Sequence, residues 1–334
     1  MKVLITGVAG FLGSHLADYY LATNCEVVGI DNLVGGYRDN VPEGVSFYDY
    51  DLSDLELIKP LFSDVDLVIH SACTAYEGLS VFSPNLIVKN TTQISASVLS
   101  AASSAKVRKF VYLSSMARYG YQDIVPFVES MTPNPQDPYG IAKYASELLV
   151  RNICDNNGIE YVILVPHNII GPRQKYDDPF RNVASIMINR MLQGKQPVIY
   201  GNGNQKRCFS FINDVVSPIT TAGKINTVNS QVINIGPDEE FISINELAKI
   251  IASKLDFNLK PIYFPDRPQE VFLANCSADK AREYLGYNTT VSLNDGIAEL
   301  INWIKSKGPK NFDYHLPIEI INEKTPKTWT MKLI

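Results

Sequence analysis

The 334-residue sequence has few of the features that would place it in a membrane or outside the cell. No uninterrupted apolar run approaches the roughly 18 residues that a membrane-spanning helix needs. The five cysteines are scattered, odd in number and form no Cys-x-x-Cys pair, which favours reduced thiols over disulfides or a zinc site. Met1 leads directly into the apolar stretch Val3–Ile5 rather than into a signal peptide. We therefore expect a cytoplasmic protein with no structural metal.

The sequence also lacks an excess of charge of one sign. Its formal net charge is −5, and basic and acidic residues are interspersed, so nothing indicates a nucleic-acid or membrane-surface partner. There is no internal repeat and no low-complexity linker. Because single cores stop growing beyond about 250–300 residues, the chain is long enough for one large core or two domains.

What the first half does contain is a regular alternation of strand and helix patterns. Such alternation predicts a doubly wound parallel sheet of the Rossmann type, whose ligands bind at the carboxyl ends of the strands. We expect strands at 2–6, 26–30, 45–48, 67–70, 110–113 and 161–165, and helices at 11–21, 85–105 and 138–156.

A glycine-rich turn follows the first predicted strand. Gly7, Gly10 and Gly13 are spaced as G-x-x-G-x-x-G, and a helical pattern begins at Phe11. Glycines at this spacing let the backbone approach a pyrophosphate, and the helix N-terminus supplies free N–H groups. A plain tight turn could have the same residues, so the glycines indicate a dinucleotide site only together with the neighbouring motifs.

An acidic residue ends the second predicted strand. Asp31 lies 18 residues after Gly13, where its carboxylate can accept hydrogen bonds from an adenosine ribose. A carboxylate here would repel a 2′-phosphate, which favours NAD over NADP. The alternative is a turn residue at a strand end.

The strongest chemical pattern lies between residues 114 and 143. Tyr139 and Lys143 are four residues apart on a predicted helix, so their side chains share one face. An ammonium near a phenol stabilises the phenolate, so we expect a lowered pKa and a general base. Ser115 is the candidate hydroxyl partner. Tyr-x-x-x-Lys can arise by chance, although only Tyr139 among the 18 tyrosines has a lysine four residues on.

The second half has a looser pattern that fits a smaller α/β substrate domain. We place the dinucleotide-binding domain at 1–166 and the substrate domain mainly at 167–334, with segments near 208–238 returning to the sheet. Helices are expected at 182–193, from Ser243 (which opens a capping-box sequence), at 278–285 and at 292–306, with a strand at 198–200 and a turn at 201–204.

Taken together, these residues resemble the extended short-chain dehydrogenase/reductases, in particular the nucleotide-sugar epimerase/dehydratase branch. The resemblance covers nearly the whole chain and is greatest to UDP-glucose (UDP-galactose) 4-epimerases. It rests on the glycine turn, Asp31, Asp51-Leu52, Ser-Ser-x-x-x-Tyr-Gly at 114–120, Tyr139/Lys143, Pro-His-Asn at 166–168, Gly171-Pro172, Gly-Asn-Gly at 201–203, Arg207 and Arg267-Pro268.

The resemblance implies an NAD-dependent epimerase whose site residues can be named. Ser115, Tyr139 and Lys143 would be catalytic. The residues implied to contact NAD are Gly7, Gly10, Phe11, Leu12, Gly13, Asp31, Asn32, Asp51, Leu52, Ala72, Asn90, Tyr139, Lys143 and Pro166. Those implied to contact a nucleoside-diphosphate sugar, with UDP as the expected nucleotide, are Ser115, Asn168, Asn182, Arg207, Arg267 and Glu270.

Several of these residues have simpler explanations. Arg207 and Arg267 could form surface ion pairs, although their places beside glycine and proline favour a diphosphate clamp. Asn90 could cap a helix. We interpret His167 as a packed, hydrogen-bonded histidine rather than a base. Tyr176 and Arg181 could contact a sugar or order their own loop.

By the same resemblance, Tyr139 would remove the sugar 4-OH proton while C4 gives hydride to NAD, and hydride would return to the other face of a 4-keto sugar. A 4,6-dehydratase is disfavoured because Met116-Ala117 follows Ser115 where dehydratases carry an acidic pair. A 4-keto reductase, a decarboxylase and a 2-epimerase stay open, as does, more remotely, a non-catalytic dinucleotide-binding regulator.

Three further expectations concern the periphery of the site. Ala274 falls where the family has a residue that limits sugar size, so a small side chain there favours room for an N-acetyl group. The tail after Trp303 is longer than in the commonest relatives, and we expect it to pack over the substrate domain or a dimer neighbour. The helices at 85–105 and 138–156 are expected to form a four-helix bundle in a homodimer. The resemblance also implies a role in cell-surface polysaccharide synthesis.

Overall fold

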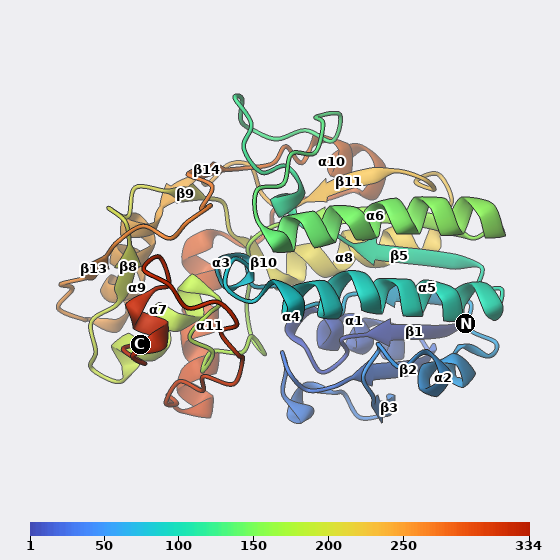
Figure 1. Ribbon diagram of the computed structural model, residues 1–334, viewed down its shortest axis with the longest axis horizontal. Coiled ribbons are helices and arrows are strands. Elements are labelled where there is room, and N and C mark those ends of the chain that lie inside the picture. Colours follow the sequence, from blue (N-terminus) through green and yellow to red (C-terminus); the bar gives the residue numbers. More distant parts are fainter.

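The computed structural model describes residues 1–334 and is built on one seven-stranded parallel sheet (Figure 1). The strand order is β11-β6-β5-β4-β1-β2-β3. The strands are β1 (Lys2–Thr6), β2 (Glu26–Asp31), β3 (Ser46–Asp49), β4 (Leu67–His70), β5 (Lys109–Leu113), β6 (Glu160–Pro166) and β11 (Val232–Ile235). Most of these segments are short apolar runs, as expected of strands covered on both faces. The predicted Rossmann-type sheet is confirmed.

Helices cover both faces of this sheet. On one face α2 (Leu55–Ile58), α5 (Ile94–Ser104) and α6 (Pro138–Asn157) bury apolar side chains such as Ile58, Val98 and Val150 against Phe110. On the other face lie α1 (Phe11–Ala22), α8 (Ile212–Lys224) and α10 (Asp279–Leu285), which share a second apolar core with β1 and β4. Figure 1 shows α5 and α6 running side by side along the sheet.

The helix predicted at 85–105 is interrupted. It begins as α4 (Pro84–Val88), passes through a π turn labelled η3 (Lys89–Gln93) and continues as α5. The Asn90 carbonyl accepts a hydrogen bond of 3.2 Å from Thr74 N, outside the helix, and Asn90 has non-helical φ −85° and ψ 15°. The prediction of one continuous helix was therefore wrong at a residue that reaches the site.

The short elements complete this half of the chain. They are η1 (Arg38–Asn40), η2 (Lys59–Phe62), α3 (Glu77–Ser80) and η4 (Met116–Arg118). The segment containing α3 connects β4 to α4, and η4 follows the end of β5, so both lie where the carboxyl ends of the strands open toward the rest of the molecule (Figure 1).

The smaller half packs three helices, α7 (Val183–Leu192), α9 (Ile244–Leu255) and α11 (Leu293–Lys307), around residues such as Met187, Leu247 and Ile297. Short strand pairs flank them: β7 (Ile169–Ile170) with β10 (Ser210–Phe211), β8 (Val198–Tyr200) with β13 (Ile262–Phe264), and β9 (Lys206–Arg207) between β12 (Ile242–Ser243) and β14 (Leu273–Ala274). Ser243 forms the capping box that its sequence predicts.

Helix α8 is the one long element that we did not predict. It contains Pro218, which lacks the N–H of a helix interior and hides the helical pattern from the sequence. Through α8 and β11 the chain returns from the smaller half to the sheet. The domain division at residue 166 stays a prediction, since segments on both sides of it contribute to the sheet.

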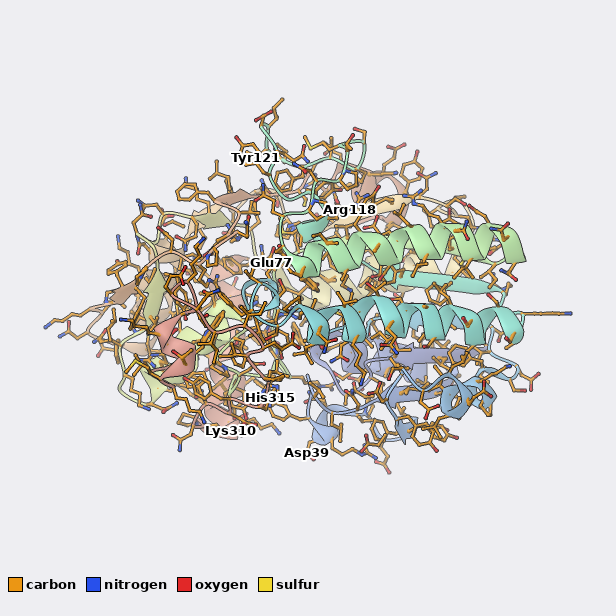
Figure 2. The ribbon with its side chains drawn as sticks, viewed as in Figure 1. Asp39, Glu77, Arg118, Tyr121, Lys310 and His315 are labelled. Carbon is orange, nitrogen blue, oxygen red and sulfur yellow. The ribbon has the colours of Figure 1, made fainter.

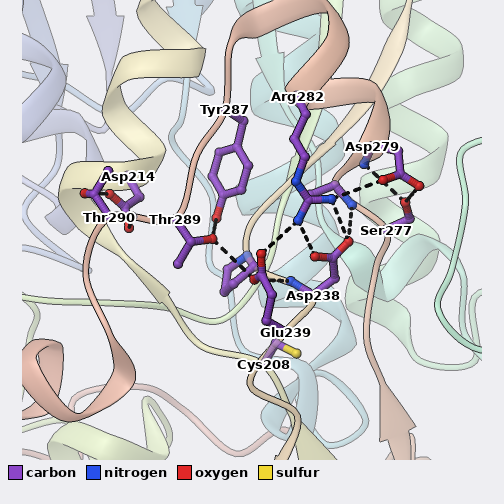
Figure 3. Close-up of polar contacts among 12 residues, drawn as sticks. Cys208, Asp214, Asp238, Glu239, Ser277, Asp279, Arg282, Tyr287, Thr289 and Thr290 are labelled. Atoms are coloured by element: carbon purple, nitrogen blue, oxygen red, sulfur yellow. Dashed lines mark hydrogen bonds and ion pairs between the residues drawn. The ribbon is translucent and has the colours of Figure 1, made fainter.

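Polar contacts hold the returning segment in place. Arg282 of α10 donates hydrogen bonds to Asp238 (3.1 Å from Nη1), Glu239 (2.9 Å) and Asp279 (3.1 Å). Figure 3 shows these side chains gathered around one guanidinium. The arginine thereby ties the loop after β11 to α10.

The tail after α11 contains a short helix near its end, α12 (Lys327–Thr330), and packs over the smaller half, one of the two positions expected for it. No helix in the protein combines the length and the apolar character needed to cross a lipid bilayer.

Candidate active site

A cavity of about 420 Å³ lies between the carboxyl ends of the sheet strands and the smaller half. Figure 2 shows Glu77, one of its lining residues, where the two halves meet. Every residue predicted for the cofactor and substrate sites lines this one cavity: Gly7, Gly10, Phe11, Leu12, Gly13, Asp31, Asn32, Asp51, Leu52, Ala72, Asn90, Ser115, Tyr139, Lys143, Pro166, Asn168, Asn182, Arg207, Arg267 and Glu270. Their individual roles remain predictions.

The glycine turn leaves no room for side chains. Gly7 has φ +74°, and a Cβ there would lie 2.9 Å from the Ala72 Cα. A Cβ on Gly13 would lie 2.1 Å from the Gly7 carbonyl oxygen. Gly10 caps α1 without a side-chain hydrogen bond, so first-turn N–H groups stay available to a ligand. This cradle fits the pyrophosphate of a dinucleotide.

Asp31 is held rigidly at the end of β2. Its Oδ2 accepts a hydrogen bond from Ala9 N (2.9 Å) and its Oδ1 accepts one from Leu33 N (2.8 Å). Burial raises the pKa of Asp31, and these backbone donors oppose the rise. Each carboxylate oxygen can accept a further hydrogen bond, so the geometry is compatible with a ribose diol.

Asp51 and Leu52, two of the residues implied to contact NAD, lie beside β3 and η3. Asp51 accepts a hydrogen bond from Ser53 N (2.9 Å) and pairs with Lys89 (3.3 Å). Burial raises the pKa of Asp51, but the Ser53 and Lys89 contacts outweigh it, so the net shift is downward. Leu52 is buried beside it.

The catalytic candidates come from β5, η4 and α6. Lys143 Nζ donates a hydrogen bond to the Leu113 carbonyl (2.7 Å) and lies 5.9 Å from the centre of the Tyr139 ring. Ser115 caps η4 by accepting a hydrogen bond from Ala117 N (3.2 Å). Asp137 caps α6 through a 2.9 Å hydrogen bond from Gly140 N and so fixes the turn that carries Tyr139.

The expected lowering of the Tyr139 pKa does not occur in the protein chain alone. Burial is the largest cause and raises the pKa of Tyr139, while Lys143, Arg181 and a hydrogen bond with Ser115 act in the opposite direction. Lys143 does favour the phenolate, as predicted, but it does not offset the loss of water. The sequence prediction was wrong on the net direction because it could not include burial.

Asn168 and Asn182 both have structural partners. Asn168, with φ +40°, donates from Nδ2 to the Cys208 carbonyl (3.0 Å). Asn182 caps α7 by accepting a hydrogen bond from Ala184 N (3.0 Å). Each amide keeps one end free to meet a ligand.

Two arginines and one glutamate form a cluster on the substrate side. Arg267 donates to both carboxylate oxygens of Glu270 (3.2 and 3.0 Å), and Arg207 Nη2 lies 3.7 Å from Glu270 Oε1. Burial raises the pKa of Glu270, but the two guanidiniums lower it by more, so the net shift is downward and the carboxylate stays charged. Paired guanidiniums at a cavity wall suit phosphate oxygens.

Sequence reasoning missed several residues that line the same wall. Tyr76 donates a 2.5 Å hydrogen bond to the buried Asp178, which also accepts from Phe180 N (2.8 Å). Tyr200 lies beneath the Arg267 guanidinium, 4.8 Å from ring centre to Cζ. None has a motif of its own, because loops distant in the sequence bring them together.

Three residues with simpler explanations in the sequence are His167, Tyr176 and Arg181. His167 is buried, and its Nε2 lies 3.0 Å from the Pro237 carbonyl, which matches a packed histidine at a strand end. The Tyr176 hydroxyl donates to the Gly308 carbonyl (2.8 Å), so this side chain orders its surroundings. Arg181 lines the cavity.

Comparisons with known proteins show which family and which solved structures the chain is similar to. Residues 3–236 match the NAD dependent epimerase/dehydratase family. The chain is 35% identical over 308 residues to a putative UDP-glucose 4-epimerase of Methanocaldococcus jannaschii, which covers 91% of this chain and 98% of that protein.

Solved structures are similarly close. The UDP-glucose 4-epimerase of Thermotoga maritima with UDP-glucose superposes with a TM-score of 0.87 at 30% identity, covering 92% of this chain and 99% of that one. The UDP-glucuronic acid 4-epimerase of Bacillus cereus, with UDP-glucuronic acid and NAD, gives 0.85 at 30% identity, covering 92% and 100%. A further relative, compared by sequence rather than by structure, is a UDP-glucuronic acid decarboxylase of Xenopus tropicalis, which is 27% identical over 92% of this chain and 72% of that protein.

Proposed function

The chain belongs to the NAD dependent epimerase/dehydratase family, and from this premise we propose that it is a 4-epimerase of a UDP-linked hexose or N-acetylhexosamine. The observation that carries the proposal is that Ser115, Tyr139 and Lys143 share one cavity with the arginine cluster. A base beside a diphosphate clamp is what chemistry on a nucleotide sugar requires.

The glycine turn and Asp31 would hold NAD, and the fit of the cradle to a pyrophosphate supports this assignment. When bound, NAD would supply reversible oxidation at the sugar carbon C4. The Asp31 carboxylate supports NAD rather than NADP, because it would repel a 2′-phosphate.

The proton is handled by the chain's own residues. Tyr139 accepts the proton of the sugar 4-OH and returns it after the sugar has turned in the cavity, and Ser115 orients the reacting oxygen. Since burial raises the pKa of Tyr139, the nearby positive charge of Lys143 is needed to bring the phenolate within reach. Exclusion of water also strengthens that electrostatic interaction.

Arg207 and Arg267 would keep the nucleotide bound while the sugar rotates. Glu270 holds Arg267 in a bidentate pair, so its guanidinium is pre-oriented at the cavity wall. Ala274 lies opposite Arg207 in β14 and is small and buried, which supports room for an N-acetyl group.

The test is proton NMR of the purified protein with a panel of UDP-, dTDP-, GDP- and CDP-hexoses, including UDP-glucuronic acid, and no added cofactor. Conversion of a UDP-sugar to its C4 epimer supports the proposal. Turnover only after addition of NADH or NADPH would make the protein a reductase. Carbon dioxide release from UDP-glucuronic acid would make it a decarboxylase, which the relatives leave open.

The first variant to test is Tyr139→Phe. We expect the epimerisation rate to fall by at least about 10²-fold, since general acid–base catalysis contributes about that much or more. Tyr144→Phe on the same helix is the matched control, because Tyr144 does not line the cavity. The NAD content of both variants should equal that of the wild type. Retained activity in Tyr139→Phe would contradict the assigned role.

A further inference from the structure

The tail from 308 to 334, which we call the strap, is fastened to the smaller half at its beginning. Lys310 N donates to Asn189 Oδ1 (3.0 Å), and Asn189 Nδ2 donates back to the Lys310 carbonyl (2.9 Å). Asp313 N donates to the Asp177 carbonyl (2.8 Å). The strap therefore starts along α7 and the loop that precedes it.

The strap then reaches the other half of the molecule. Ser83 Oγ donates to the Pro317 carbonyl (2.7 Å), and the Glu319 carboxylate accepts hydrogen bonds from Asn85 N and Leu86 N, each 2.9 Å. A carboxylate at this position satisfies free N–H groups in the first turn of α4. The strap thus connects the two halves on the side where the cavity lies.

Trp329 is the central apolar contact of the strap. Its side chain is 2% exposed and meets three aromatic rings edge to face: Phe82 at 6.1 Å, Phe180 at 5.4 Å and Tyr200 at 6.4 Å between ring centres. These rings belong to three separate segments that bound the cavity: the one containing α3, the one before α7, and β8. A single indole therefore packs against three segments that line the substrate side of the cavity.

Thr328 connects the strap to the arginine cluster. Its Oγ1 shares a 2.5 Å hydrogen bond with the Tyr200 hydroxyl, and the Arg267 guanidinium lies over that same tyrosine ring. Gly78 is enclosed between Arg267 and Trp329, since a Cβ on Gly78 would lie 3.0 Å from Arg267 Nη1 and 3.4 Å from the Trp329 ring. Thr328 is fully buried, so this contact is shielded from water.

We propose that the strap is a positioning element of the nucleotide-sugar site: Thr328 and Trp329 fix Tyr200, and through it Arg267, and hold residues 77–83 against the sugar side of the cavity. The proposal rests on the function proposed above, because it assigns Arg267 to the diphosphate. The dinucleotide cradle lies outside these contacts. The strap should therefore control affinity for the nucleotide sugar and leave NAD binding unchanged.

The binding test uses UDP as the probe and isothermal titration of the full chain. Thr328→Val removes the hydroxyl that meets Tyr200 and should weaken UDP binding about fivefold, the effect of one lost hydrogen bond. Trp329→Phe should weaken it less than Trp329→Ala. Thr330→Val, an exposed change in the same short helix, is the matched control. Unchanged UDP affinity in Thr328→Val and Trp329→Ala, or an equal loss of NAD affinity, would overturn the proposal.

Amide hydrogen exchange separates this proposal from the proposed function. In Thr328→Val, exchange should become faster at 77–83 and 266–271 while β1 and β2 keep the wild-type rates. If the wild type binds no UDP but these two segments loosen in the variant, the proposed function fails, while the strap's positioning of the two segments themselves stands. If neither segment changes, the positioning role is wrong, whatever the nucleotide.

Discussion

At the residue scale, His70 shows how strongly burial decides the charge of a side chain. Its ring lies at the end of β4, with Nδ1 2.7 Å from Thr6 Oγ1 and Nε2 3.0 Å from Ser95 Oγ. Burial first, and the charge of Lys143 second, lower the pKa of His70 to about 3. The imidazole is therefore neutral in the folded protein at neutral pH, and it joins β1 to α5 by hydrogen bonds.

This shift predicts a pH dependence of stability. The unfolded chain binds a proton at His70 below about pH 6.5, whereas the folded chain does so only below about pH 3. The contribution of His70 to the free energy of unfolding is therefore complete above about pH 6.5 and declines as the pH falls. The difference in unfolding free energy between the wild type and His70→Gln should narrow by about 3 kcal/mol from pH 7 to pH 4. Denaturant titrations at both pH values measure it. A constant difference would show that His70 is not the responsible group.

Residue identities in the site were largely readable from the sequence, but their electrostatics were not. The glycines, Asp31, Ser115, Tyr139 and Lys143 were singled out from spacing and resemblance, and all line one cavity. The direction of the Tyr139 pKa shift was not predictable, because it depends on the desolvation produced by packing of remote segments.

At the scale of elements, a buried ion pair holds η4 against α6. Arg118 Nε lies 2.9 Å from Glu147 Oε1, and the two side chains are 3% and 0% exposed. The Ser114 hydroxyl also donates to the Glu147 carboxylate. Ser115 and Tyr139 belong to the two segments joined in this way, so the pair sets their relative position.

We expect Arg118→Met to lower the free energy of unfolding by about 3 kcal/mol, because it leaves the Glu147 carboxylate buried without its partner. The double variant Arg118→Met/Glu147→Leu is the control, since an apolar pair of similar size removes the uncompensated charge and should recover much of the loss. Chemical denaturation measures both. If the double variant is no more stable than the single one, the buried charge is not the cause.

Elements were predictable where a strong pattern coincided with local hydrogen bonding. The capping box at Ser243 formed as its sequence indicates. The break at Asn90 was not predictable, because it depends on a hydrogen bond from Thr74. Thr74 lies outside the helix, so no pattern within the helical segment indicates this contact. Helix α8 was missed for a similar reason: Pro218 weakens the pattern, and packing against α1 and the sheet restores the helix.

At the scale of the whole molecule, one helical face carries exposed apolar side chains. Ile141 and Leu148 lie seven residues apart on α6 and are 53% and 49% exposed, and Val88 on α4 is 47% exposed. Residues at this spacing share one face of a helix. We propose that the helical run 85–105 (α4 to α5) and α6 pair with the same elements of a second copy, in the homodimer expected from the sequence.

Leu148→Glu should convert such a dimer into a monomer, because the carboxylate would be desolvated at a symmetric interface and would occur twice in it. Light scattering after size-exclusion chromatography measures the mass directly. Leu57→Glu, at a comparably exposed leucine of α2, should leave the mass unchanged. A wild type that elutes as a monomer would refute the proposal.

The sequence by itself determined the Rossmann-type sheet and the position of the glycine turn, because these depend on local periodicity and on residue types at fixed spacing. Its resemblance to a known family supplied the other site candidates, whose roles stay predictions. Only the tertiary structure decided how the strap joins the two halves, which rings surround Trp329 and how far burial raises the pKa of Tyr139. These features arise from contacts between segments as distant in the sequence as Phe82 and Trp329. No local pattern encodes such contacts, since they form only when the whole chain packs.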